Sequence, residues 1–294
     1  MEAIKEVSPE FTPLNESIES LQSWLRFGRR YWRTFFQQHL YRKRFSAIEK
    51  HCLFIGYPRS GHTLIASLLD AHQNISISKG VDTLQYFERG FTLSQIYWLY
   101  VRQARRFTKK GCKSNGYSYL VPNQWNGKCS ELKVIGDKSG EVLAERLRTR
   151  PELLDKLLHE KHIEHKFIHV IRNPFDNIAT FSIRNRIDLN QAISHYFVLC
   201  ETVAKARKKI DPINWIDIRH EEMICKPQPM LTQLCHFLGQ EPSTTYLKDC
   251  ADIVFKSPSK TRSMAPWTSS LIQRIETEIK QYPLLAEYGF EANL

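Results

Sequence analysis

The 294-residue sequence lacks the features that mark secreted, membrane-spanning and zinc-bound proteins. Its seven cysteines are scattered without any C-x-x-C pair, so neither a disulfide framework nor a cysteine zinc site is expected. No apolar run is long enough to span a bilayer, and the first thirty residues contain no apolar signal-peptide core. We therefore expect a reduced, cytoplasmic protein.

Several catalytic and nucleic-acid-binding signatures are missing as well. The sequence has no G-x-S-x-G elbow, which argues against a serine hydrolase. His159, His162 and His165 follow one another at intervals of three residues, not at the four-residue spacing of H-E-x-x-H, so no metal site is expected. Zinc-finger, helix-turn-helix and RNP motifs are also absent from the sequence, and no nucleic-acid partner is expected.

Charge is abundant and mostly positive. The 42 Lys and Arg outnumber the 31 Asp and Glu, which gives a formal net charge of +11 and favours anionic partners. Nucleic acid, an anionic membrane surface and a phosphorylated ligand all fit, and so does a simple excess of solvated surface charge. With 42% hydrophobic residues, the chain can bury the core of one large domain.

The N-terminal 45 residues differ in pattern from the rest of the chain. Residues 1–20 predict a polar arm, and residues 21–45 predict a helix in which aromatic and basic side chains are interspersed. Such a helix either packs its aromatic side chains on the domain, the interpretation that we favour, or lies on an anionic membrane surface. Residues 46–294 predict a single domain with an aromatic-rich insertion at about 90–129, the kind of segment in which binding pockets are built.

Within the domain, short apolar runs alternate with helical patterns. Strands are expected at 51–56, 75–78, 132–136, 166–171 and 214–218, and helices at 62–72, from 137 to about 162, from 173, at 189–209 and up to Gly239. This alternation predicts an α/β fold of three layers, with a mostly parallel sheet and helices on both faces.

The most informative loop lies between the first strand and its helix. It reads G-Y-P-R-S-G-H-T (56–63), which is the spacing of G-x-x-x-x-G-K-[ST] with His62 in place of Lys. A loop of this kind points backbone N–H groups and a helix N-terminus at a bound phosphate. Because a neutral imidazole cannot supply the charge of the missing Lys, Arg59 is the candidate cation.

A second polar cluster follows a later strand. In KFIHVIRNPFDNIAT, Arg172 lies at the end of the strand, Pro174 in the first turn of a helix, and Thr180 two turns along that helix. The guanidinium of Arg172 and the hydroxyl of Thr180 form a candidate second anion site.

In this order, the two motifs resemble those of the sulfotransferase family that uses 3′-phosphoadenosine 5′-phosphosulfate (PAPS). The first seven positions of the family motif P-[KR]-[ST]-G-[ST]-T-x-L correspond to the segment from Pro58 to Leu64, and R-[ND]-P corresponds to the segment that begins at Arg172. The resemblance implies a P-loop-like sulfotransferase fold and in-line transfer of a sulfuryl group from PAPS to a hydroxyl or amine of a small molecule. The resemblance further implies that the 5′-phosphosulfate is bound by Arg59, Ser60, Gly61, His62, Thr63 and Leu64. The 3′-phosphate is then bound by Arg172 and Thr180.

The resemblance covers most of residues 50–282 and includes a late basic loop, KSPSKTRSM. In this loop Lys256, Lys260 and Arg262 are candidates for further contacts with the 3′-phosphate, and a solvated loop is the alternative. His62 and Thr180 depart from the family pattern, which has a hydroxyl residue and Ser at these positions. A bacterial natural product fits a cytoplasmic member as the acceptor, but neither the acceptor, the attacked atom nor the oligomeric state is predicted.

A hydroxyl acceptor must lose its proton, so a general base is expected beside Arg59, which neutralises charge on the transferred group. Family members use either His or an acidic residue beyond the second strand, and Asp82 occupies the latter position. We place Asp82 first, then Asp137 with Lys138 beside it as a charge stabiliser, and then His62. The alternative for either Asp is that it caps a helix.

Two other functions are compatible with the sequence. A P-loop kinase or NTPase shares the strand, loop and helix, although the missing Lys counts against it. A basic protein that binds nucleic acid or a membrane surface without catalysis also fits the net charge.

Overall fold

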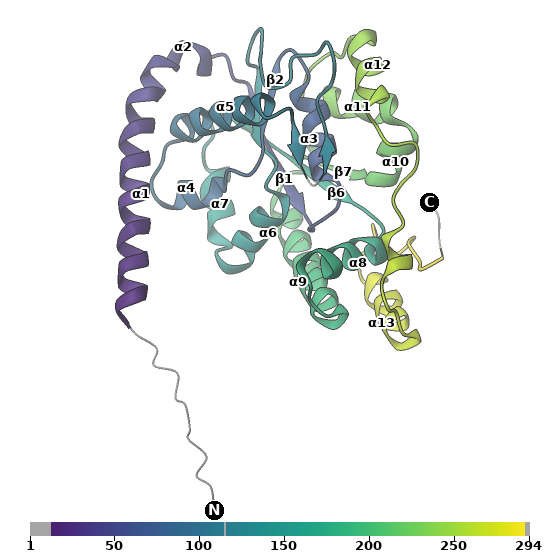
Figure 1. The fold of residues 1–294 in the computed structure, drawn as a ribbon. Helices are drawn as coiled ribbons and strands as arrows, with labels where there is room; N and C mark the ends of the chain where they lie inside the picture. Colours follow the sequence, from purple (N-terminus) through teal and green to yellow (C-terminus); the bar gives the residue numbers. More distant parts are fainter. Residues whose placement is uncertain (1–12, 115, 292–294) are drawn as a thin grey trace, which may run out of the picture.

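A five-stranded sheet in the order β2-β5-β1-β6-β7 forms the centre of the protein (Figure 1). A computed structural model of the chain describes residues 13–114 and 116–291, with side chains from residue 25 onward. All neighbouring strands of this sheet are parallel, so the predicted parallel arrangement is confirmed. The strands are β1 (Lys50–Gly56), β2 (Ile75–Ser78), β5 (Val134–Asp137), β6 (Glu164–Ile171) and β7 (Trp215–Arg219).

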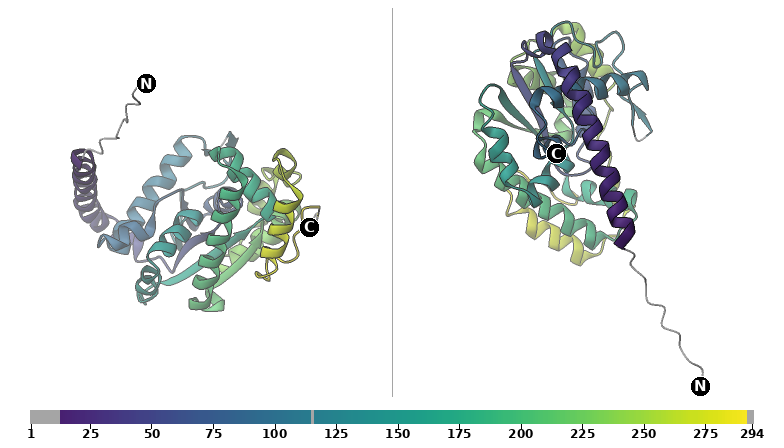
Figure 2. Two further views of the ribbon diagram at one scale, coloured as in Figure 1. Left: turned by 90° about the horizontal axis from the view of Figure 1, so that it is seen from below. Right: turned by 90° about the vertical axis from the view of Figure 1, so that its left-hand side faces the viewer.

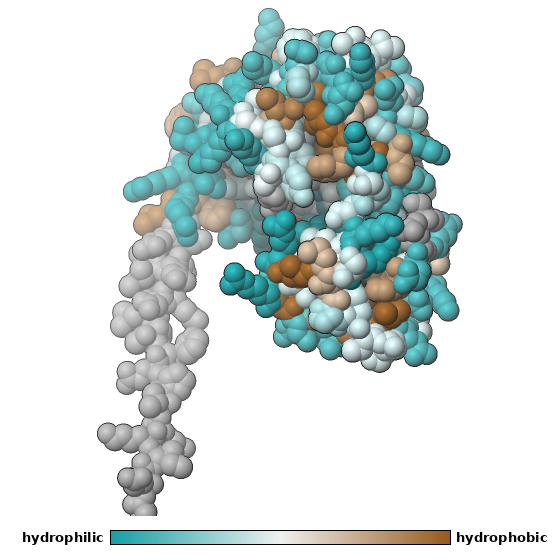
Figure 3. All heavy atoms as spheres, turned by 45° about the vertical axis from the view of Figure 1, so that its right-hand side comes forward, coloured by the Kyte–Doolittle hydropathy of each residue, from teal (hydrophilic) through white to brown (hydrophobic). Residues whose placement is uncertain are grey.

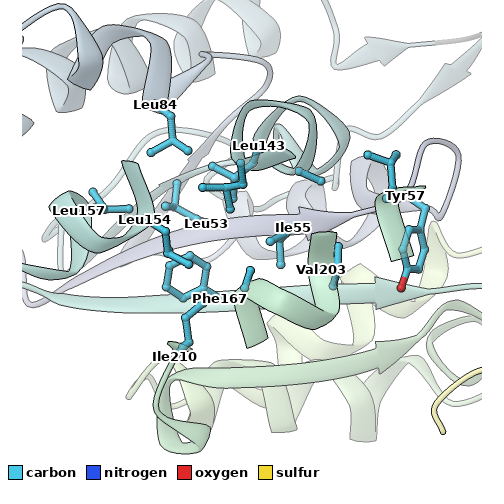
Figure 4. Close-up of a cluster of buried hydrophobic side chains, with 14 of the residues drawn as sticks. Leu53, Ile55, Tyr57, Leu84, Leu143, Leu154, Leu157, Phe167, Val203 and Ile210 are labelled. Atoms are coloured by element: carbon cyan, nitrogen blue, oxygen red, sulfur yellow. The ribbon is translucent and has the colours of Figure 1, made fainter. Parts of the chain in front are cut away.

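Helices cover both faces of the sheet, because both faces are apolar. Along β1, Leu53 and Ile55 belong to one hydrophobic cluster, and Cys52 and Phe54 belong to a second cluster on the opposite side. The first cluster, part of which is drawn in Figure 4, is closed by α6 (Gly140–Thr149), α7 (Glu152–Leu158) and α9 (Leu189–Lys209). The second is closed by α3 (His62–Asp70), α10 (His220–Cys225), α11 (Pro227–Phe237) and α12 (Thr244–Asp252). The predicted three-layer α/β fold is therefore confirmed.

One expected segment differs from the structure. The charged helix expected to run to about residue 162 is split into α6 and α7 at Pro151, which lacks the N–H needed to continue α6 and moves Arg150 out of the helical region (φ −137°, ψ 66°). The insertion at 90–129 contains a regular helix, α5 (Leu93–Lys109), which begins at a capping box formed by Thr92 and Gln95. A two-stranded hairpin, β3 (Lys113–Ser114) and β4 (Tyr117–Ser118), follows α5.

The N-terminal helix α1 (Pro13–Leu40) begins before the expected position, so residues 13–20 are helical and not an arm. Residues 1–12 of the expected arm lie outside the described part of the chain. One side of α1 packs on the domain: the ring of Phe27 lies 5.5 Å from that of Tyr86, and Gln95 donates a hydrogen bond of 3.0 Å to Thr34. No described helix is long and apolar enough to cross a membrane. The remaining elements are α2 (Arg42–Phe45), α4 (Thr83–Glu88), α8 (Pro174–Asn185), α13 (Ser269–Ile279) and the 3-10 turns η1 (Pro212–Asn214) and η2 (Thr261–Met264).

The parallel arrangement gathers the carboxyl ends of the strands along one edge of the sheet. Strand β1 lies between β5 and β6, and the chain leaves these three strands at Gly56, Asp137 and Ile171. In open parallel sheets, ligands bind at this edge, where neighbouring connections diverge. The polar residues that follow these strands in sequence are thereby brought near one another.

Candidate functional site

The loop after β1 has a tight backbone that depends on residues with positive φ. Arg59 has φ 66° and Gly61 has φ 93°, and the left-handed region is costly for a residue with a side chain such as Arg. The buried Ser60 hydroxyl donates to the Tyr57 carbonyl oxygen at 3.1 Å and accepts a hydrogen bond of 2.8 Å from the Asn177 side chain. Ser60 therefore fixes the shape of the loop and does not line the cavity described below.

Helix α3 begins with backbone donors that are not used by the protein. Its N-cap is Gly61, which has no side chain to cap the helix, and the first helical bond runs from Leu64 N to the Gly61 carbonyl at 3.1 Å. Within the described residues, the amides of residues 59–63 make no hydrogen bond. Unused N–H groups at the start of a helix form a binding position for an anion, as the motif predicts.

Arg172 connects the second motif to this loop. Its Nη1 donates to the carbonyl oxygen of Arg59 at 3.1 Å, and its Nη2 donates to the carbonyl oxygen of Ser259 at 2.7 Å. The hydroxyls of Thr180 and Thr261 lie 2.6 Å apart beside it, and Thr261 Oγ1 is 3.3 Å from Nη2. Burial lowers the pKa of Arg172 from its ordinary value. The guanidinium remains the charged centre of this part of the site, because its ordinary pKa is above 12.

One cavity of about 970 Å³ contacts both motifs. The late loop and the β3–β4 hairpin form its apolar walls, and the rings of Tyr117 and Phe255 meet there with centroids 5.2 Å apart. The insertion at 90–129 thus contributes to the cavity through this hairpin. The sequence-predicted residues that line the cavity are Arg59, Gly61, His62, Thr63, Leu64, Lys138, Arg172, Thr180 and Lys256.

Lys138 adds a second cation beside the loop, and Glu141 adds a carboxylate. Burial lowers the pKa of Lys138, the charges of Asp137 and Glu141 raise it, and the charge of Arg59 lowers it, so these groups are electrostatic neighbours. Glu141 lies in the first turn of α6 and is the one carboxylate among the described residues that line the cavity. The sequence analysis missed Glu141, because an acid in the first turn of a helix is common for reasons of helix polarity alone.

His62 lines the cavity, but its ring is packed into the protein. Burial, followed by the charge of Lys138, lowers the pKa of His62 to about 3, so the imidazole is neutral near pH 7. Its Nε2 is buried without a partner and faces two glycines: a Cβ on Gly140 would lie 2.6 Å from it, and one on Gly56 3.1 Å. The covered Nε2 and the lowered pKa argue against His62 as the base and favour a packing role for its ring.

His220 is a second imidazole at the site, and the sequence analysis did not identify it. It follows β7 directly, lines the cavity, and lies so close to Gly61 that any Cβ there would collide with its ring. Burial and then the charge of Arg172 lower its pKa to about 3. The signal that could have found it is its position at the carboxyl end of a strand, in the segment WIDIRHEE.

The structure does not bring Asp82 to the cavity. Its carboxylate caps α4 by accepting a hydrogen bond of 3.1 Å from Gln85 N, and it also forms an ion pair with Arg146. Asp82 is absent from the described residues that line the cavity. The helix-capping alternative therefore describes Asp82 better than the role of a base.

Asp137 is buried behind the cavity wall. It accepts hydrogen bonds from the hydroxyls of Ser78 and Ser139 and, at 3.0 Å, from the Val81 amide. Burial raises its pKa to about 6, and these hydrogen bonds oppose the rise. Because its oxygens already accept three protein donors, Asp137 joins the ends of β2 and β5 and does not face an acceptor.

The late loop contributes differently from what the sequence indicated. Lys260 is exposed and does not line the cavity, whereas Lys256 does. Arg262 is buried and lies 3.6 Å from the carboxylate of Asp176, which also accepts a 2.9 Å hydrogen bond from the Arg262 amide. These contacts attach the loop to α8, so Arg262 acts behind the cavity wall. No cluster of His, Cys, Asp and Glu that could hold a metal occurs in residues 13–114 or 116–291.

Comparisons with known proteins agree with the fold and the motifs. A family model described as "Sulfotransferase family" matches residues 52–244. No curated protein sequence matches the chain. Among solved structures, sulfotransferase STF9 from Mycobacterium avium is 12% identical with a TM-score of 0.54, over 98% of this chain and 89% of that one, which supports a shared fold.

Other solved structures have lower TM-scores. The sulfotransferase domain from the curacin biosynthetic pathway is 16% identical, with a TM-score of 0.48 over 79% of this chain and 98% of that one. Mouse sulfotransferase SULT7A1, solved in complex with PAP, is 13% identical, with a TM-score of 0.39 over 76% of this chain and 69% of that one.

Proposed function

Because the chain belongs to the sulfotransferase family, we propose that it transfers a sulfuryl group from PAPS to a hydroxyl or amine of a small acceptor. The observation that carries this proposal is the shared cavity of the two anion sites. A donor with phosphate on both the 5′ and the 3′ oxygen of one nucleoside needs two cationic sites within reach of each other. The hydrogen bond of 3.1 Å between Arg172 and the Arg59 carbonyl is consistent with that requirement.

The donor binds, in this proposal, with its phosphosulfate on the first loop and its 3′-phosphate at Arg172. The free amides of residues 59–63 and the side chain of Arg59 hold the 5′ end. The Arg172 guanidinium makes three hydrogen bonds to the protein, and its other N–H groups can bind an anion. The Thr180 hydroxyl lies beside them. His220 lines the cavity beside Gly61 and is an electrostatic neighbour of Arg172, so we place the nucleoside against its ring.

The transfer runs in line, with the acceptor attacking sulfur as the bisphosphate leaves. The protein then has to position the two reactants and neutralise the charge that grows on the bridging oxygen. Arg59 and Lys138 supply two cations beside the loop, so the charge that a P-loop lysine would provide comes from two other positions. A P-loop kinase is not favoured by this arrangement, because no lysine follows Gly61.

We assign the general base to Glu141. Its carboxylate lines the cavity and is an electrostatic neighbour of Lys138, which in turn neighbours Arg59. A base placed next to the cations that hold the transferring group is within reach of an acceptor that attacks it. The aromatic wall formed by Tyr117 and Phe255 is where we place the acceptor.

The donor assignment is tested by comparing the affinities of 3′-phosphoadenosine 5′-phosphate (PAP) and 5′-AMP in calorimetry. The two ligands differ only in the 3′-phosphate, so the unmodified protein should bind PAP more tightly. Arg172→Lys should weaken PAP binding roughly tenfold or more, since one charge-assisted hydrogen bond contributes about 1.5–3 kcal/mol, and should change AMP binding much less. Equal affinity for both nucleotides, or tight binding of ATP with Mg²⁺ in place of PAP, would falsify the donor assignment.

The acceptor is identified by a screen of small hydroxyl and amine compounds with labelled PAPS. Sulfated product formed without added metal supports the reaction. Turnover that needs ATP and Mg²⁺, with no sulfated product, points to the kinase alternative.

A further inference from the structure

The outward side of α1 exposes a stripe of large apolar side chains. Leu25, Trp32, Phe36 and Leu40 are 46%, 60%, 64% and 77% exposed. Their spacings of seven, four and four residues place them along one side of the helix. The right-hand view of Figure 2 shows α1 running across the domain with this outer side uncovered.

Packing of α1 on the domain does not use this stripe. The helix is anchored by its opposite side. There the ring of Phe27 packs on that of Tyr86, the ring centroids of Tyr31 and Phe91 are 5.1 Å apart, and Thr34 is fully buried. The interpretation that the aromatic side chains serve packing is therefore right for Phe27 and Tyr31. It does not account for the stripe, so the stripe needs another explanation.

Arginines without acidic partners among the described residues flank the stripe on one side and continue onto the adjoining α5. Arg29 and Arg33 lie on α1, and Arg102 and Arg106 on the adjoining α5; none of the four forms an ion pair with an acid in the described residues. The guanidinium groups of Arg33 and Arg102 both lie 5.5 Å from the ring of Trp98. Burial, and then repulsion from Arg33, Arg106 and Arg30, lowers the pKa of Arg102. The mutual repulsion of these like charges is relieved when an anionic partner binds them.

We propose that this face of α1 and α5, defined by the apolar stripe and the four arginines, binds the surface of an anionic lipid membrane, with α1 lying parallel to it. An interfacial helix combines outward Trp, Phe and Leu side chains with basic residues, because the apolar side chains enter the acyl boundary while the charges meet the headgroups. Figure 3 views the molecule from the opposite diagonal, with the outward side of α1 turned away, and at the left of that view apolar side chains lie among mostly hydrophilic ones. A nucleic acid would be held by the arginines alone and would leave the apolar stripe in water.

The test is flotation of the full chain with lipid vesicles. Vesicles that contain phosphatidylserine should bind the protein, and neutral phosphatidylcholine vesicles should not. Binding should weaken when salt is raised. The double variant Arg29→Gln with Arg33→Gln should lower the affinity by roughly fivefold per arginine. Trp32→Ser with Phe36→Ser should lower it by at least tenfold, because two buried rings are lost.

Matched controls use exposed residues elsewhere on the surface. Ile213 is 71% exposed on η1, and Lys208 is exposed on α9, so Ile213→Ser and Lys208→Gln should bind vesicles as the unmodified protein does. Equal binding to neutral and anionic vesicles overturns the proposal. So does binding that is indifferent to the Trp32 and Phe36 substitutions, or tight binding of a DNA duplex that depends on the arginines and not on the apolar pair. None of the residues changed here lines the cavity, so donor binding provides a separate check that each variant is folded.

Discussion

Replacing Gly140 with Ala should disturb the donor site through a single contact. Gly140 is the first residue of α6, and a Cβ there would lie 2.6 Å from Nε2, 2.8 Å from Cε1 and 3.0 Å from Cδ2 of His62. Ordinary contacts begin near 3.4 Å, so the ring must move by about 0.8 Å. The same Nε2 also faces Gly56, and a hydrogen bond that the imidazole donates to the backbone of Ile55 fixes the orientation of the ring. The ring therefore has little room in which to move.

The expected cost follows from this crowding. Overpacking of a filled interior costs about 1–3 kcal/mol, and the better helix propensity of Ala returns at most about 1 kcal/mol. A net loss of about 1–2 kcal/mol corresponds to a fall in Tm of roughly 2–8 °C for a chain of this size. Because His62 is the first residue of α3, its displacement also moves the amides that face the donor, and PAP affinity should fall roughly tenfold.

Thermal unfolding and calorimetry with PAP, applied to four proteins, measure both effects. These are the unmodified chain, Gly140→Ala, His62→Ala and the double variant. Without the imidazole, Gly140→Ala has nothing to collide with, so its cost in Tm and in affinity should disappear in the double variant. The reasoning is refuted if Gly140→Ala is harmless in the unmodified chain, or if its cost is unchanged when His62 is Ala.

Two further predictions concern protonation. The pKa of His220 is lowered to about 3 from an ordinary value of 6.5, so the unfolded chain binds more protons between these values, and stability is lost as pH falls from 6.5 toward 3. His220→Gln should make this loss shallower by up to about 1.4 kcal/mol per pH unit in denaturant titrations, whereas His162→Gln, at an exposed side chain, should leave it unchanged. Glu141→Gln should lower kcat by roughly 10² to 10⁴ with unchanged PAP affinity, and Asp82→Asn should keep kcat; the opposite ranking in steady-state assays would return the role of base to Asp82.

The anion-binding motifs could be predicted because their geometry is local. A strand, a tight loop and a helix N-terminus are adjacent in sequence, so the spacing from Gly56 to Thr63 is enough to place donors around one point. Arg172 is equally determined, because it ends a strand of the same parallel sheet. The break at Pro151 was also available from local chemistry, although the sequence analysis extended the helix through it.

The candidate base could not be predicted in the same way, because it depends on contacts between distant segments. Asp82 forms an ion pair with Arg146, which is 64 residues away in the sequence, and this contact makes it a poor candidate for the base. No sequence pattern links the two residues. The roles of the late-loop residues also depend on distant contacts. Arg262 binds Asp176, which is 86 residues away in the sequence, whereas the nearby Lys256 lines the cavity. Which of several polar side chains faces a cavity depends on tertiary packing, and a single sequence does not specify that packing.

The departure of His62 from the P-loop pattern has a physical explanation in the surrounding residues. A lysine at this position would begin its side chain in a space walled by Gly56 and Gly140, with Lys138 already nearby. Burying a second ammonium beside Lys138 would bring two like charges together in a poorly solvated space, which is unfavourable unless an anion is always bound. A neutral imidazole fills the same space without that penalty, and the cations come from Arg59 in the loop and Lys138 after β5. The charge of the site is thereby set by residues that face the cavity, while His62 sets the packing beneath them.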